Sequence, residues 1–121
     1  MPVKIQNVYQ VTQNMGRALD FYGGLLGMTV KFQDGARWAQ LDAGGARFAL
    51  SSPEEAGAAA ASNTVIVFEV DDLDAMRKQL EAASAPILAT RDMGSHGSTL
   101  TSQDPDGNII QFFVRAPKAP S

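Results

Sequence analysis

The sequence of 121 residues predicts an α+β fold built from two copies of one unit, each with the element order βαβββ. Two observations predict this fold. An extended run rich in β-branched and aromatic residues leads into a helix start at residues 8–15, and again at residues 66–73. Further strand candidates, separated by turn residues, then follow each helix. A pattern that recurs in this way indicates a repeated structural unit.

Each predicted helix begins after a residue whose side chain can accept a hydrogen bond from the free amides of the first turn. These residues are Asn14 and Asp72. The first helix, about residues 15–25, and the second, about residues 73–82, both carry apolar residues at i, i+3 and i+4 spacing. Gly27 is well suited to end the first helix, because glycine tolerates the left-handed conformation.

Three strand candidates follow each helix, and the turns between them use residues that adopt positive φ at low cost. The candidates are residues 28–32, 37–41 and 47–51 in the first half and residues 87–90, 98–102 and 108–114 in the second.

We expect one domain over residues 1–121, because this length suits a single compact domain. Module one is predicted at about residues 4–52 and module two at about residues 63–115. Residues 53–62 should form a connector with one helical turn at its start. Residues 116–121 should form a flexible tail.

The composition excludes several classes of function. Hydrophobic residues make up 45% of the chain and charged residues 19%, which is enough apolar material for a core. The formal net charge of −3 and the scattered Lys and Arg residues argue against a nucleic-acid surface. The absence of cysteine excludes disulfides and thiolate metal sites. With no signal peptide and no bilayer-spanning apolar run in the sequence, we expect a cytoplasmic protein without membrane contact.

Two pieces of the sequence point to a known family. They are the Phe21–Tyr22 pair spaced before Gly27, and the turn formed by residues 104–108. In their order and spacing they resemble the vicinal-oxygen-chelate superfamily, which contains glyoxalase I, extradiol dioxygenases and the bleomycin-resistance proteins. The resemblance covers about residues 4–115. It implies that each module curls into half a barrel with its helix on the convex face, and that the two modules form a U-shaped trough for ligands.

The resemblance also implies positions for a metal site. Metal-dependent members of the superfamily place histidine and glutamate at four strand positions. The corresponding positions in this chain are Asn7, Val65, Gln111 and either Phe48 or Ala49. Aliphatic and aromatic side chains donate no lone pair, and amides offer only neutral carbonyls, which suit hard cations better than Zn, Fe or Ni. We therefore expect no metal at the usual site and no other cofactor.

Two titratable residues allow alternative interpretations. His96, the single histidine, could be a general base or a replacement ligand, but a solvated loop residue between Gly94 and Gly97 is the favoured interpretation. Glu69 has the strand parity of Val65 and should face the trough. It could act as a base or hydrogen-bond acceptor, although a structural salt bridge is favoured.

Alternation along the strands predicts that the trough is lined by apolar and aromatic side chains with a few amides. The residues predicted to line it are Asn7, Tyr9, Phe32, Trp38, Phe48, Val65, Val67, Glu69, Met93, His96, Gln111 and Phe113. Such a lining suits a flat, drug-sized molecule held by stacking and hydrogen bonds. For Trp38, ligand binding and core packing both stay open.

The favoured hypothesis is a metal-free binding protein that sequesters an aromatic or peptide antibiotic or a toxic metabolite, and so confers resistance or self-protection. The resemblance implies a homodimer with two equivalent sites at the interface. The alternative is a glyoxalase- or dioxygenase-like enzyme of the same fold, with relocated metal ligands or metal-free acid–base chemistry. A small accessory domain with another ligand is a third interpretation.

Overall fold

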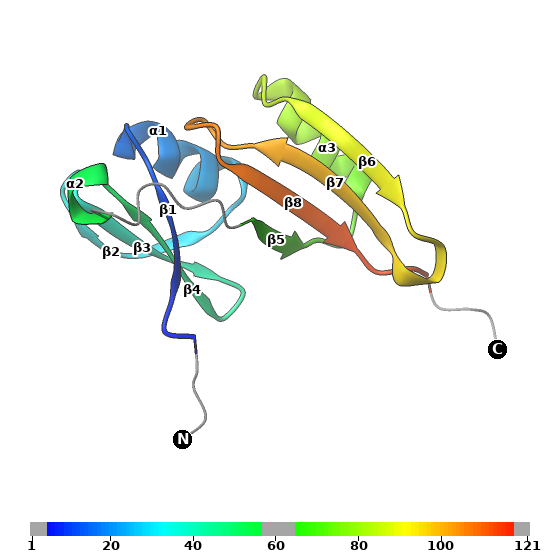
Figure 1. The fold of residues 1–121 in the computed structure, drawn as a ribbon, viewed down its shortest axis with the longest axis horizontal. Helices are drawn as coiled ribbons and strands as arrows, with labels where there is room; N and C mark the ends of the chain where they lie inside the picture. Colours follow the sequence, from blue (N-terminus) through cyan, green and yellow to red (C-terminus); the bar gives the residue numbers. More distant parts are fainter. Residues whose placement is uncertain (1–4, 57–64, 118–121) are drawn as a thin grey trace. The chain divides into compact units, whose positions relative to one another are not determined.

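The computed structural model describes residues 5–56 and 65–117, and the chain divides into two units with the boundary between residues 62 and 63 (Figure 1). Each unit contains one open, four-stranded mixed sheet, which confirms the predicted α+β fold of two βαβββ modules. None of the helices in the two described ranges is long and apolar enough to cross a membrane.

The first unit follows the predicted element order. Its elements are β1 (Val8–Val11), α1 (Met15–Leu19), the π-helical segment η1 (Asp20–Leu25), β2 (Thr29–Asp34), β3 (Trp38–Ala43), β4 (Ala46–Ser51) and α2 (Pro53–Ala56). The strands lie in the order β1-β4-β3-β2. β1 pairs in parallel with β4, and the other pairs are antiparallel.

The second unit repeats this arrangement. Its elements are β5 (Ile66–Glu69), α3 (Leu73–Ala82), β6 (Ile87–Asp92), the 3₁₀ turn η3 (Gly94–His96), β7 (Ser98–Gln103) and β8 (Ile109–Val114). The strand order is β5-β8-β7-β6, again with a parallel pair between the first and the last strand. The strand after the helix is irregular at the same place in both units, between Val30 and Phe32 in β2 and between Ile87 and Ala89 in β6.

The predicted helix starts are confirmed. The Asn14 carboxamide oxygen accepts a hydrogen bond from the Arg17 amide at 3.0 Å, and Asp72 caps α3 in the same way through Ala75, also at 3.0 Å. The first helix differs from the single α-helix predicted for residues 15–25, because α1 passes into η1. There the Leu26 amide donates to the carbonyl of Phe21, five residues back. The Gly-Gly pair inside η1 has low α-helix propensity. Little stability is therefore lost when the backbone widens there from an α-helical to a π-helical turn.

The connector and the tail are only partly described. The helical turn predicted at the start of the connector is present as α2, and the Arg37 guanidinium binds the Glu55 carboxylate of α2 at 2.7 Å. Residues 116–117 have no regular structure. The remaining connector residues, 57–62, and tail residues 118–121 lie outside the described ranges.

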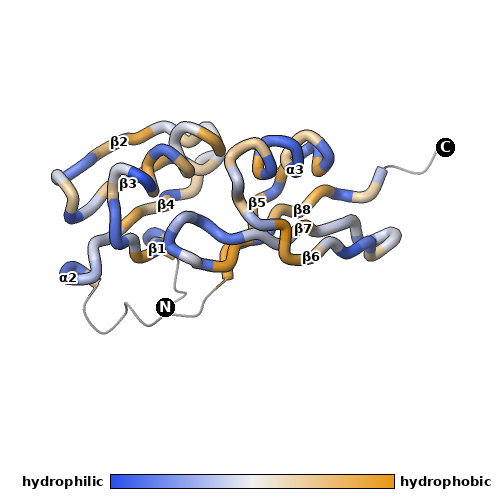
Figure 2. Tube along the Cα trace, turned by 90° about the horizontal axis from the view of Figure 1, so that it is seen from above, coloured by the Kyte–Doolittle hydropathy of each residue, from blue (hydrophilic) through white to orange (hydrophobic). Residues whose placement is uncertain are grey.

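In each unit the core lies between one face of the sheet and the helix. In the first unit the rings of Tyr22 and Phe48 lie 4.7 Å apart, and both side chains are buried. In the second unit Leu80 of α3 and Phe112 of β8 are buried, and much of β8 is hydrophobic in Figure 2. Residues of opposite parity on each sheet consequently form a second face, which we call the open face.

The turn before β8 is built around one carboxylate. Asp104 is buried, and its Oδ1 accepts hydrogen bonds from the amides of Asp106 and Asn108, each at 2.9 Å. Its Oδ2 accepts from the Asn108 side chain at 2.8 Å. The Asp104 carboxylate therefore holds together the turn at residues 104–108, which joins β7 to β8.

Gly97 occupies a position that tolerates no side chain. Its φ is +90°, and a Cβ there would lie 2.7 Å from Cε1 of Phe113 and closer still to the carbonyl oxygen of Val114. Gly44 also has positive φ, at +64°, but a Cβ added to it would have no neighbouring atom within 4 Å. Alanine at Gly44 would therefore add backbone strain alone, whereas alanine at Gly97 would add both backbone strain and a steric clash.

We predict that Gly97→Ala lowers the free energy of unfolding by more than Gly44→Ala does, because it adds a clash to the cost of positive φ. Backbone strain alone costs on the order of 1–3 kcal/mol. Urea unfolding of both variants checks this prediction. Equal losses would contradict the contact between Gly97 and the Phe113 ring.

Candidate functional site

The open face of the first unit carries an aromatic pair that spans β4. The ring centroids of Tyr9 and Trp38 lie 5.4 Å apart in an edge-to-face arrangement. Tyr9 is on β1 and Trp38 on β3, and the strand register places Ala49 beside Tyr9 and Ser51 beside Trp38 on the intervening β4. Both of these β4 residues are small and fully buried. The rings can meet because β4 presents no large side chain on this face.

Two further predicted residues belong to this face. Phe32 pairs with Gln40 across β2 and β3, and its side chain is 58% exposed. Asn7 lies two residues before Tyr9, where it continues the alternation of β1.

The predicted position of Phe48 in the trough is wrong. Phe48 pairs with Val8 and Leu41 in the sheet and packs against Tyr22 on the helix side. Its buried side chain belongs to the core. Ala49, the alternative fourth ligand position, has the parity of the open face.

On the open face of the second unit, two rows of side chains cross the sheet. The strand register gives the rows Val67–Gln111–Thr101–Ala89 and Glu69–Phe113–Thr99–Arg91. In the first row the Gln111 Nε2 group donates a hydrogen bond to Thr101 Oγ1 at 3.2 Å. Val67 is 53% exposed, and Val65, which precedes β5, is 44% exposed. Predicted site residues therefore come together on this face around one amide–hydroxyl pair.

Glu69 lies at the end of β5 in an ion pair with Arg115, whose Nε is 3.3 Å from Glu69 Oε2. Both side chains are largely exposed. The position of Glu69 on the open face is as predicted, and the ion pair corresponds to the favoured structural interpretation.

His96 and Met93 belong to the turn between β6 and β7. His96 ends η3 with an exposed side chain, and Met93 is half-buried. The Met93 amide donates to the Gly97 carbonyl at 2.8 Å, which closes the turn. Because β5 and β8 also end at this edge of the sheet, the strand register places His96 at the same edge as Glu69 and Phe113, without a described contact to either.

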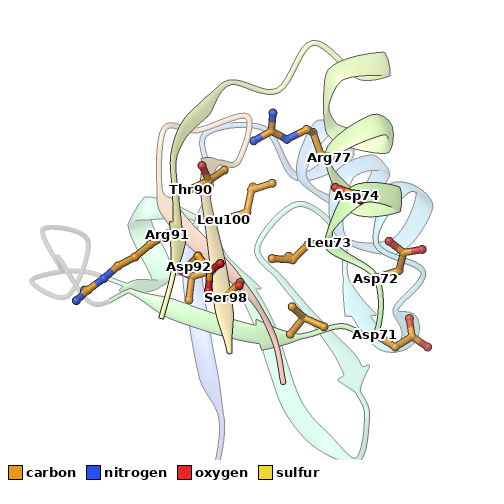
Figure 3. Close-up of a pocket in the computed structure, with 12 residues that line it drawn as sticks. Asp71, Asp72, Leu73, Asp74, Arg77, Thr90, Arg91, Asp92, Ser98 and Leu100 are labelled. Carbon is orange, nitrogen blue, oxygen red and sulfur yellow. The ribbon is translucent and has the colours of Figure 1, made fainter. Parts of the chain in front are cut away.

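A groove of about 440 Å³ opens on the helix side of the second unit (Figure 3). It is lined by Asp71, Asp72, Leu73, Asp74, Arg77, Thr90, Arg91, Asp92, Ser98, Thr99, Leu100 and Val114. In Figure 3 Leu73 and Leu100 lie between α3 and the strands, whereas Arg91 points away from the helix. The lining offers carboxylates, guanidinium groups and hydroxyls around a small apolar floor.

This groove was not predicted from the sequence. The feature that could have indicated it is the polar character of three residues at helix-facing positions of β6 and β7, namely Thr90, Asp92 and Ser98. Polar side chains at these positions leave a groove between α3 and the strands in place of a packed apolar core. Thr101 was also missed, although its pairing with Gln111 follows from the alternation on either side of the turn at residues 104–108.

The donor set does not fit the metal site of the family. The positions that the family resemblance implies for metal ligands hold Asn7 and Val65, which directly precede β1 and β5, Gln111, and Ala49, which the register places on the open face in place of Phe48. Ala49 and Val65 have no ligand atom in their side chains, and Asn7 and Gln111 offer only neutral amide oxygens. Residues 5–56 and 65–117 contain no group of three or more His, Cys, Asp or Glu side chains that could hold a metal ion. Neither transition-metal coordination nor a metal-bound reaction step can be assigned to these four residues.

Comparisons with known proteins agree with this fold. An uncharacterized protein from Mycolicibacterium smegmatis is 29% identical over 110 residues, which are 91% of this chain and 92% of that protein. The crystal structure of lactoylglutathione lyase from Agrobacterium tumefaciens matches with a TM-score of 0.80 and 18% identity, over 93% of this chain and 94% of that chain. The fosfomycin resistance protein FosX from Listeria monocytogenes, complexed with Mn(II) and a sulfate ion, matches with a TM-score of 0.78 and 10% identity. That match covers 96% of this chain and 93% of the FosX chain.

At these identities the structural matches establish a shared fold. Family membership follows from the sequence itself. A family model matches residues 4–112, nearly the whole chain, in agreement with the resemblance found in its motifs. The chain therefore belongs to the Glyoxalase/Bleomycin resistance protein/Dioxygenase superfamily.

Proposed function

We propose that this protein is a metal-free binding protein that sequesters an aromatic or peptide antibiotic, or a toxic metabolite of similar chemistry. The observation that carries the proposal is the set of residues at the four ligand positions of the family, Asn7, Ala49, Val65 and Gln111. These side chains give apolar surface and hydrogen bonds in place of metal coordination. Capture of a ligand needs no catalytic centre, whereas the reactions of the metal-dependent relatives do.

The open faces supply the groups that such a ligand requires. Tyr9, Trp38 and Phe32 offer aromatic surface in the first unit, and the second offers Val67 and Phe113 around the Gln111 amide. Apolar contact surface with a small number of polar groups that orient the ligand is typical of small-molecule sites. Aromatic side chains contribute most of the contact area in such sites.

We predict that the purified, untagged protein contains no stoichiometric metal and binds none when the chelated form is titrated with Zn, Ni, Mn and Fe(II). Elemental mass spectrometry and calorimetry measure this directly. A tightly held, stoichiometric ion would overturn the metal-free proposal. It would favour the alternative of an enzyme with relocated ligands, which a lactoylglutathione lyase assay on the loaded protein would then test.

We predict that the emission of Trp38, the single tryptophan, changes when the protein binds metal-free bleomycin or doxorubicin, chosen as a peptide antibiotic and a flat aromatic drug. Asn7→Ala should weaken the binding by about 5- to 10-fold, the cost of one hydrogen bond, without changing the thermal unfolding midpoint. Gln79→Ala is a control that removes an exposed amide on α3, the helix that covers the opposite face of the second unit's sheet.

An affinity that is indifferent to Asn7 would contradict this placement of the site. Unchanged Trp38 emission across a broad panel of aromatic and peptide antibiotics would contradict the sequestration function itself.

We further propose that two copies of the chain form a homodimer with two equivalent sites. Every residue of the edge strand β2 is exposed, and Val30 and Phe32 expose 41% and 58% of their surface. Exposed apolar side chains on an unpaired edge strand are typical of surfaces that associate.

We predict a dimer in sedimentation equilibrium at micromolar concentration, with one bleomycin or doxorubicin molecule bound per chain. A monomer that binds ligand with the same stoichiometry would contradict the dimer and leave the binding function intact.

A further inference from the structure

We propose that Thr101 positions the Gln111 side chain so that its carbonyl oxygen accepts a hydrogen bond from the ligand, and that the ligand is accordingly a flat apolar molecule with an N–H donor. This inference rests on the proposed binding function and names the ligand class and the residue that determines it. It concerns the open face of the second unit alone.

Gln111 and Thr101 lie in the middle of one row of side chains across the open face of the second unit. The row across the sheet runs from Val67 through Gln111 and Thr101 to Ala89, so the amide–hydroxyl pair is flanked by an aliphatic side chain at each end. Along β8, the neighbours of Gln111 on the same face are Ile109 and Phe113. A ligand that covers Gln111 therefore meets apolar side chains on three sides of the amide, from Val67, Ile109 and Phe113, and the Thr101 hydroxyl on the fourth.

The bond to Thr101 engages the Nε2 end of the Gln111 amide and leaves its Oε1 end for the ligand. The Nε2 group of Gln111 donates to Thr101 Oγ1 at 3.2 Å. The carbonyl oxygen, Oε1, has no hydrogen-bond partner among the residues that the structure describes. Gln111 is half-buried, so a ligand lying over the row removes water from this oxygen. A ligand without a donor would leave the oxygen unpaired, and a site built to pair a polar group discriminates against ligands that cannot do so.

The Gln111 carbonyl oxygen carries no charge, which favours a neutral N–H donor in the ligand. An amide oxygen accepts an N–H bond without carrying a charge, and the one carboxylate in the neighbouring row, Glu69, is already paired with Arg115. Heteroaromatic rings that carry a ring N–H, such as indole, combine a flat apolar body with one donor. They match the apolar neighbours on three sides of Gln111 and the carbonyl oxygen of its side chain.

The test uses indole and 1-methylindole, which have the same ring system and differ in the N–H group. Their dissociation constants are measured by NMR titration of the full chain, following backbone and side-chain amide signals. In the wild type, indole should bind about 5- to 10-fold more tightly than expected from 1-methylindole after correction for the added methyl group. The correction comes from Gln111→Leu, which has no acceptor and should bind both probes according to their hydrophobicity alone.

Thr101 is tested as a positioning residue. Thr101→Val removes the hydroxyl at nearly constant shape and should lose most of the preference for indole, whereas Thr101→Ser keeps the hydroxyl and should retain it. The Gln111 side-chain NH₂ signals should shift in Thr101→Val before any ligand is added. All variants are checked for folding by their amide spectra.

The outcomes separate this inference from the proposed function. Equal, measurable binding of both probes to the wild type and to Gln111→Leu would overturn the donor preference and leave a binding site. Binding of neither probe, together with no response to bleomycin or doxorubicin, would count against the binding function itself. A preference for indole that survives in Thr101→Val would overturn the role of Thr101.

Discussion

The parallel pairing of the first strand with the last strand in each unit is the constraint on which the rest of this structure depends. A parallel pair cannot be joined by a tight hairpin, so the chain crosses from β1 and from β5 through a helix. That helix covers one face of the sheet and leaves the other open. The same pairing places Tyr9 beside Ala49 and Val67 beside Gln111, so it also brings together the side chains of the candidate site.

The element order, the helix starts and the turn at residues 104–108 could be predicted from sequence because each depends on local signals. Asn14 and Asp72 cap their helices through residues three positions away. The choice between Phe48 and Ala49 could not be made in this way, because it depends on the register between β1 and β4, which are distant in sequence. The passage of α1 into η1 was likewise missed, since the apolar spacing in residues 15–25 is that of a regular α-helix.

The small side chain of Ala49 allows the aromatic contact in the first unit. Ala49 lies on β4 between the strands that carry Tyr9 and Trp38, and it is fully buried. The Tyr9 and Trp38 rings meet across this small residue. At the equivalent place in the second unit, Gln111 forms a hydrogen bond with Thr101 instead.

The matching irregularities in β2 and β6 show how closely the two units repeat each other. They occur in the same strand of each unit, directly after the helix, within sheets of identical strand order. Such agreement carries the internal repeat beyond the element order to the backbone of a single strand. The side chains do not follow this repeat: Ala49 and Gln111 occupy equivalent places beside the first strand of their units. One backbone plan therefore presents two chemically different faces, an aromatic one and an amide-bearing one.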